Sequence, residues 1–263
     1  MSLNRFTDKT VFISGGSKGI GLSCAHRFAT EGADVFLASS NASLLADARQ
    51  NIEAASGRKV GFHAADLRSL EACEAAAASM LSEFGRCDIL INCAGATRGG
   101  LFPEQPDDDM LDGFALKFHA AVRLSRCLWP SLVASSGSVV NVVGGFARTP
   151  AADYMVGGAV NAALANFSKA LAAKGLQDDV NVNWIHPGLT VTERLETIFA
   201  DRAVQQGKTA AQVQEAMVAD EGIRRLGEPE DVAALVAFLC SAEARHIQGA
   251  GIPIDGGGSK GYV

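Results

Sequence analysis

The chain has 263 residues, 48% of them hydrophobic, and a formal net charge of −6 at neutral pH. This length can form one large domain, and the acidic balance argues against nucleic acid or an anionic membrane as the main partner. No apolar run approaches the ~20 residues of a membrane helix, the amino terminus has no signal-like core, and neither the six cysteines nor the five histidines show metal-ligand spacing. We therefore expect a cytoplasmic protein with reduced thiols and no metal site.

Short apolar segments alternate with helical patterns along the whole chain. The expected strands are Val11–Ser14, Asp34–Ala38, Val60–Ala64, Ile89–Asn92, Ser138–Val143, Val180–Ile185 and Gly251–Ile254. The expected helices are Gly19–Glu31, Ala42–Ser56, Ser69–Phe84, Asp107–Ala134, Ala151–Lys174 (with Gly175 as its stop signal) and Pro229–Leu239. Such alternation predicts an α/β fold, a doubly wound parallel sheet in a single domain over 1–263. The one long connection, about 188–227, predicts a lid.

A glycine-rich turn joins the first strand to the first helix, Ser14-Gly-Gly-Ser-Lys-Gly-Ile-Gly21. In this context glycines permit a tight turn, close approach of a pyrophosphate and close helix–strand packing, with the phosphates at the helix N-terminus. The candidate cofactor contacts here are Gly15, Ser17, Lys18, Gly19, Ile20 and Gly21.

Further motifs follow in a fixed order. They are Asp66-Leu67 after the third strand, Asn92-Cys93-Ala94-Gly95 after the fourth, Pro187-Gly188 with Thr192 after the sixth, Arg225–Ala233, and Asp255-Gly256-Gly257. Together with the glycine turn they resemble the short-chain dehydrogenase/reductase family over essentially the full length. The resemblance implies cofactor contacts at Asp66, Leu67, Asn92, Ala94, Gly95, Pro187, Gly188 and Thr192. For the final Asp-Gly-Gly we favour a structural turn near a subunit contact.

The catalytic pattern departs from that family. The resemblance implies a tyrosine, a lysine four residues later, a serine after the fifth strand and an asparagine in the long middle helix. Tyr154 matches, but Gly158, Gly144 and Lys117 stand at the other three positions. A free phenol has a pKa near ~10, and an adjacent cation shifts a pKa by ~1–3 units, so a tyrosine acid needs a cation nearby.

Two interpretations of Lys117 stay open. Either Lys117 replaces the missing lysine, holding the nicotinamide ribose and lowering the pKa of Tyr154, or the chemistry is lost and Tyr154 only contacts the cofactor. The resemblance favours hydride exchange with a carbonyl or secondary alcohol. The alternatives are a catalytically weak dinucleotide-binding protein with a structural or sensing role, and a methyltransferase, which the later motifs disfavour.

Cofactor, substrate and assembly can also be predicted. The second strand lacks the terminal acid of NAD-specific relatives and offers Ser39, Ser40 and Asn41 instead, which with Lys18 favours NADP(H), with NAD(H) possible. Three arginines follow strand ends, Arg98, Arg148 and Arg194, and suit an anionic or acyl-carrier-linked substrate. The resemblance implies a homotetramer or homodimer formed through the two long helices.

Overall fold

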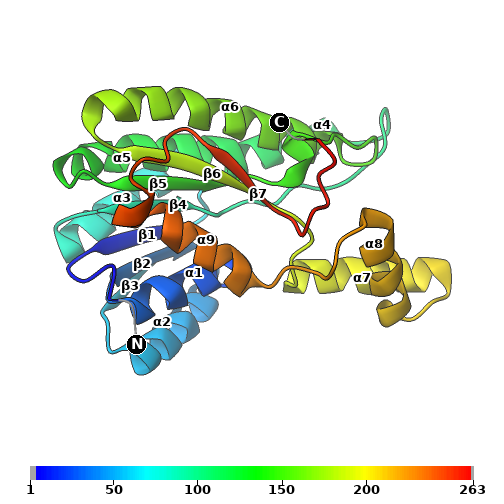
Figure 1. Ribbon diagram of the computed structural model, residues 1–263, viewed down its shortest axis with the longest axis horizontal. Helices are drawn as coiled ribbons and strands as arrows, with labels where there is room; N and C mark the ends of the chain where they lie inside the picture. Colours follow the sequence, from blue (N-terminus) through cyan, green and yellow to red (C-terminus); the bar gives the residue numbers. More distant parts are fainter. Residues whose placement is uncertain (1–3, 262–263) are drawn as a thin grey trace.

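The computed structural model describes residues 4–261 and contains a seven-stranded parallel sheet (Figure 1). The strand order is β3-β2-β1-β4-β5-β6-β7. The strands are β1 (Thr10–Ser14), β2 (Asp34–Ser39), β3 (Val60–Ala64), β4 (Ile89–Asn92), β5 (Ser138–Val142), β6 (Asn181–Pro187) and β7 (Gly251–Ile254). All seven expected strands are confirmed, with shifts of one or two residues at some ends. The doubly wound α/β fold predicted from the alternation is therefore correct.

Helices cover both faces of this sheet. One face carries α1 (Gly19–Thr30), α2 (Ala42–Ser56) and α9 (Pro229–Leu239), packed on one side of the strands. The other carries α3 (Leu70–Phe84), α5 (Ala120–Ala134) and α6 (Met155–Asp178). Because both faces are buried, the strands are apolar without alternation. The winding direction reverses between β1 and β4, and this switch point is where ligands of such sheets bind.

The helix predicted over Asp107–Ala134 is not uniform. It comprises α4 (Asp107–Gly113), a π-helical segment (Phe114–His119) and α5. π-helical turns inside α-helices are frequently found at functional sites. The segment contains Lys117, so the irregularity falls on the position where the family resemblance places a catalytic asparagine.

The helix predicted over Ala151–Lys174 begins and ends later than expected. Residues up to Tyr154 form a turn, and α6 runs to Asp178, with Asp179 in the left-handed conformation at its C-cap (φ 56°). Gly175 is not a stop signal: a Cβ there would lie 2.2 Å from the carbonyl oxygen of Val180. The glycine is needed because α6 approaches the chain just before β6 this closely.

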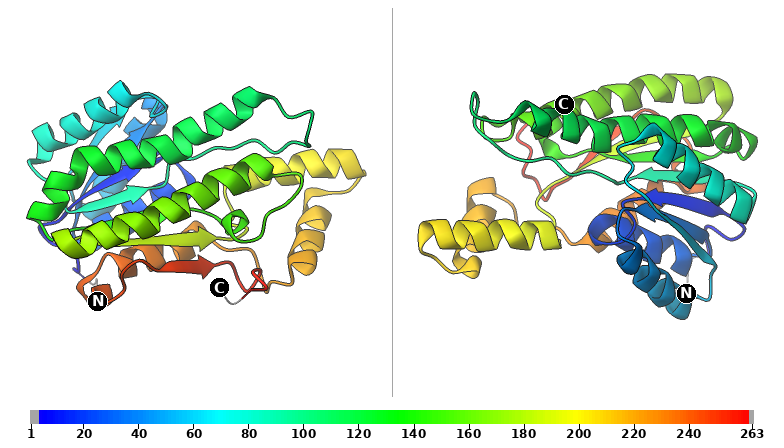
Figure 2. Two further views of the ribbon diagram at one scale, coloured as in Figure 1. Left: turned by 90° about the horizontal axis from the view of Figure 1, so that it is seen from above. Right: turned by 180° about the vertical axis from the view of Figure 1, so that it is seen from behind.

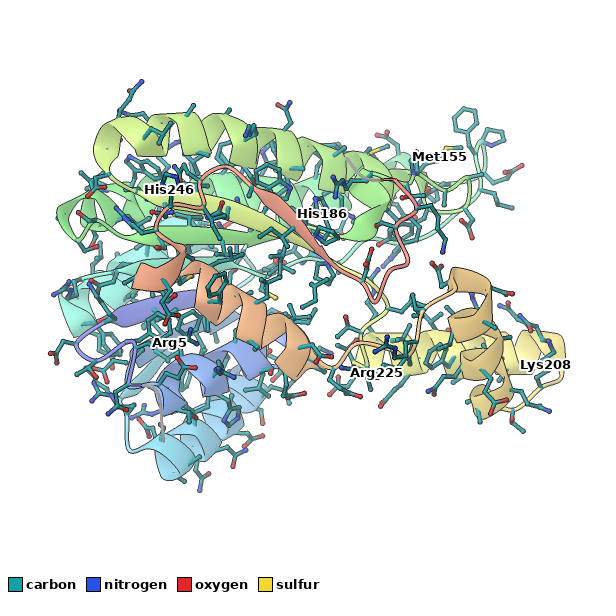
Figure 3. The ribbon with its side chains drawn as sticks, viewed as in Figure 1. Arg5, Met155, His186, Lys208, Arg225 and His246 are labelled. Atoms are coloured by element: carbon teal, nitrogen blue, oxygen red, sulfur yellow. The ribbon has the colours of Figure 1, made fainter. Side chains whose placement is uncertain are left out.

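The long connection forms two helices that project from the body in every view (Figures 1 and 2). They are α7 (Glu193–Gln206) and α8 (Ala210–Glu221). They share a small apolar core of their own, which includes Leu195, Phe199 and Val213. Arg225 lies where the excursion returns to the body, and Lys208 lies at its far end (Figure 3). No helix within residues 4–261 has the length and apolarity to cross a membrane.

Candidate functional site

The glycine turn forms a backbone cradle at the carboxyl end of β1. Gly15 adopts φ +70°, and a Cβ there would lie 2.9 Å from Cα of Ala94. A Cβ on Gly21 would lie 2.2 Å from the carbonyl oxygen of Gly15. Glycine is thus required at both positions, and α1 begins directly at this turn with its N–H groups directed to the switch point.

The segment after β4 closes the other side of the cradle. Ser14 Oγ accepts hydrogen bonds from the backbone N–H groups of Cys93 and Ala94, both at 3.1 Å. The side chain of Asn92 is buried and donates to Asn141 Oδ1 at 2.8 Å. The predicted cofactor segment Asn92–Gly95 therefore lies beside the glycine turn, positioned by buried hydrogen bonds.

The end of β2 carries an unsatisfied hydroxyl. Ser39 Oγ is buried without a hydrogen-bond partner in the described part of the chain. Ser40 beside it is exposed, and Asn41 caps α2 by accepting from Leu44 N at 3.0 Å. A buried hydroxyl of this kind normally has a partner, so its position fits a bound group such as a ribose phosphate.

The residues predicted near adenine follow β3. Asp66 Oδ1 lies 3.0 Å from Nη1 of Arg68, and Leu67 is buried at 2% exposure. Leu67 therefore packs in the core, and the carboxylate of Asp66 remains half-exposed at the sheet edge.

The segment after β6 joins the body to α7. A Cβ on Gly188 would lie 2.8 Å from Asp255, which explains the glycine after Pro187. Asp255 accepts from the N–H groups of Gly257 and Ser259, at 3.0 and 2.9 Å, as a structural turn does.

Thr192 caps the start of α7. Its Oγ1 accepts from Leu195 N, and its Cγ2 would lie 3.3 Å from a Cβ on Gly19. Next to it, the Glu193 carboxylate forms an ion pair with the Lys18 ammonium, with 2.9 Å between Oε2 and Nζ. The first turn of α7 therefore rests on the glycine turn, and Lys18 faces this helix.

Tyr154 lies at the start of α6, with its hydroxyl in a polar cluster. Its Oη forms a hydrogen bond with Thr97 Oγ1 and accepts from Arg194 Nη2 at 3.0 Å. The same Arg194 nitrogen donates to the Thr97 carbonyl oxygen at 2.8 Å. The Phe146 ring packs against the phenol, with centroids 4.7 Å apart. The polar cluster therefore fixes where the phenol hydroxyl points.

Lys117 reaches the same region from the π-helical segment. Its stem lies over Gly95, where a Cβ would approach Lys117 Cδ to 2.9 Å. Its ammonium donates to the carbonyl oxygen of Val143, directly after β5. The pKa of Lys117 is lowered to about 8, chiefly by burial; Cys93 opposes this change, and the charge of Arg194 contributes to it. Lys117 therefore points inward beside the predicted nicotinamide segment, and its hydrogen bond goes to the backbone rather than to Tyr154.

The two departed positions differ in the space around them. A Cβ on Gly158 would contact only the Phe146 carbonyl oxygen, at 3.4 Å, so room for a longer side chain remains. A Cβ on Gly144 would lie 3.1 Å from Asn161 Nδ2. Asn161 is buried, and its Oδ1 has no partner among the described residues. The glycine at 144 therefore accommodates the side chain of Asn161.

The three arginines expected to rim the crevice do not converge. Arg98 pairs with Asp109 at 3.2 Å and lines a surface hollow of about 480 Å³. Arg148 lines a different hollow of about 330 Å³, which His186 on β6 also lines (Figure 3). Arg194 reaches Tyr154. The three arginines therefore have different neighbours, and their binding of an anionic substrate stays a prediction.

Thr97 is the site residue that sequence reasoning missed. The signal available was a hydroxyl two residues beyond the Asn92–Gly95 motif. Its partner Tyr154 is 57 residues away, and the bridge between Gly100 and Tyr154 brings the two segments together. Within residues 4–261 no group of three or more His, Cys, Asp or Glu side chains is arranged to hold a metal.

A glycine cradle at the switch point of a parallel sheet, with Lys117 over the segment that follows β4 and Tyr154 beside Thr97, is typical of a dinucleotide-dependent oxidoreductase. A family model described as enoyl-(acyl carrier protein) reductase matches residues 15–259. The chain therefore belongs to the short-chain dehydrogenase/reductase family, and it is an oxidoreductase acting on alcohols or carbonyls.

Individual relatives agree with this assignment. The chain is 33% identical to an uncharacterised oxidoreductase of Mycobacterium tuberculosis, over 98% of this chain and 94% of the relative. It resembles the L-sorbose reductase of Gluconobacter frateurii complexed with NADPH and L-sorbose, with TM-score 0.95, 31% identity and coverage of 99% and 100%. It also resembles a short-chain dehydrogenase of Burkholderia cenocepacia in complex with NADP, with TM-score 0.84, 32% identity and coverage of 97% and 99%.

Proposed function

We propose that this protein is an NADP(H)-dependent oxidoreductase in which Tyr154 exchanges the hydroxyl proton of a secondary alcohol or carbonyl substrate. The observation that carries this proposal is the placement of the Tyr154 hydroxyl beside Thr97 and the cation of Arg194. Lys117 lies inward over Gly95 in the same region.

The cofactor preference for NADP(H) over NAD(H) rests on the end of β2. Ser39 replaces the acid that would repel a 2′-phosphate, and its buried, unpartnered hydroxyl is free to donate to that group. The structural neighbours crystallised with NADPH and NADP support the same choice. When bound, NADPH supplies the hydride that adds to the carbonyl carbon. The glycine turn holds the pyrophosphate, and Asn92–Gly95 with Pro187, Gly188 and Thr192 hold the nicotinamide side.

Lys117 takes the role of the family's catalytic lysine, whose position in this chain is occupied by Gly158. Its stem passes over Gly95, and its ammonium has hydrogens left after donating to Val143, which suits it to hold a ribose hydroxyl. This assignment keeps a cation beside the nicotinamide ribose although the family position on α6 is a glycine.

The substrate we propose is a small carbonyl compound, and an anionic group on it would bind Arg194. The guanidinium uses only Nη2 in its hydrogen bonds within the described residues, so Nε and Nη1 remain open to a carboxylate. We further propose that α5 and α6 form the contact of a homodimer or homotetramer, and that α7 and α8 act as a lid.

The test is NADPH consumption against a panel of neutral and anionic carbonyl compounds. Lys117→Asn should lower kcat/KM by about 10²-fold or more, because a group that positions reactants contributes on that scale. The double variant Lys117→Asn/Gly158→Lys restores the family arrangement in the space beside Gly158 and should recover part of the loss. If Lys117→Asn is as active as the parent, the replacement is refuted and the catalytically weak interpretation gains support.

A further inference from the structure

Arg194 is the one residue of the lid helices that reaches the Tyr154 hydroxyl among the described residues. Its Nη2 donates to Tyr154 Oη at 3.0 Å and to the Thr97 carbonyl oxygen at 2.8 Å. A guanidinium nitrogen carries two hydrogens, so both bonds form at once. The Thr97 hydroxyl is the second neighbour of the phenol oxygen.

The charges around the phenol are unbalanced. Neither Arg194 nor Lys117 has a carboxylate among its hydrogen-bond partners in residues 4–261. An arginine does not lose its proton in proteins, and a cation that donates a hydrogen bond to an oxygen favours the anionic form of that oxygen. The surroundings of Tyr154 are therefore suited to the phenolate that remains after proton donation.

The same turn of α7 also contacts the cofactor side of the site. Glu193 binds Lys18 of the glycine turn at 2.9 Å, and Thr192 contacts Gly19. The residue that follows, Arg194, binds Tyr154. Because α7 and α8 pack mainly on each other, a movement of this pair would break both contacts together.

We infer that Arg194 is a cation delivered by the lid, which stabilises the Tyr154 phenolate and makes proton transfer depend on lid closure. In carbonyl reduction the O–H bond of Tyr154 breaks, its electron pair stays on the phenolate oxygen, and the proton forms the O–H bond of the alcohol whose carbon received the hydride. Solvent water then returns a proton to Tyr154. The inference rests on the proposed function, in which Tyr154 is the proton donor.

A charge-conserving variant separates the effect of the cation from that of the side chain. Arg194→Lys keeps the positive charge near the Tyr154 hydroxyl and should retain more of the parent kcat than Arg194→Gln does.

The kinetic arm uses the parent protein, Arg194→Gln and a matched control. Arg202→Gln lies on α7 two turns further, where Arg202 contacts Met217 instead of the active site. Arg194→Gln should lower kcat by about 10-fold, and Arg202→Gln should match the parent.

The outcomes separate the inference from the proposed function. If Arg194→Gln keeps the parent kcat while Tyr154→Phe is inactive, the inference is refuted and the proposed function stands. If Tyr154→Phe keeps the parent activity, the proposed function itself fails.

Discussion

Replacing Lys117 by methionine should remove activity, but it should also remove the free-energy cost of burying a charge. The lysine has its pKa lowered from 10.5 to about 8, chiefly by burial, so folding disfavours its charged form. The difference between a pKa of 10.5 and one of about 8, at ~1.36 kcal/mol for each pH unit, sets an upper limit of about 3.4 kcal/mol on this penalty at low pH. Methionine keeps an unbranched stem over Gly95 and loses the hydrogen bond to Val143, which costs about 1–2 kcal/mol. At about pH 7 the variant should therefore be more stable by about 1–2 kcal/mol.

The pH dependence gives the sharper test. Because the folded pKa of Lys117 lies below its unfolded value, the penalty is complete at pH well below 8 and disappears as the pH rises toward 10.5. Urea unfolding of both proteins in the absence of cofactor measures the difference, since all other titrating groups are shared. From about pH 7 to about pH 10 the parent should gain about 2.5 kcal/mol relative to Lys117→Met. If the difference in unfolding free energy between the two proteins does not change with pH over this interval, the interpretation of Lys117 as a buried cation is refuted.

Two further substitutions test the cofactor site. Ser39→Asp should weaken NADPH binding by about 10-fold or more and improve NADH binding, because the carboxylate repels a 2′-phosphate and accepts hydrogen bonds from ribose hydroxyls. Fluorescence titration with both cofactors measures the two affinities, and an unchanged NADPH affinity would show that Ser39 does not contact the cofactor. Gly21→Ala should abolish cofactor binding and lower the stability of the fold, because the new Cβ would lie 2.2 Å from the Gly15 carbonyl oxygen. Thermal unfolding with and without NADPH checks both effects, and a rise of Tm with NADPH equal to that of the parent would contradict the role of the glycine turn in cofactor binding.

The sequence predicted what depends on local pattern. Short apolar strands and the Ser14–Gly21 turn are read from neighbouring residues, and the sheet with its switch point followed from them. The π-helical segment at Lys117 was missed because its apolar spacing is compatible with an ordinary helix. Gly175 was misinterpreted because its role depends on Val180 across a tertiary contact rather than on its own helix.

The active-site cluster shows the same limit more strongly. Thr97, Tyr154 and Arg194 come from three separate segments, and no periodicity connects them. Lys117 was selected from the sequence as an unusual residue, but its hydrogen bond to Val143 depends on how β5 ends relative to the π-helical segment. Chemistry that depends on side chains from distant loops requires the three-dimensional arrangement.

The most direct test of the account is the activity of Tyr154→Phe. This change removes only the phenol oxygen and keeps the ring against Phe146, so folding and NADPH affinity should remain near those of the parent. With any carbonyl compound that the parent reduces, the variant should lose about 10²–10⁴-fold in kcat, the usual contribution of a positioned proton donor. A Tyr154→Phe protein that oxidises NADPH with the same substrate at the parent rate would contradict the assignment of this tyrosine as the proton donor.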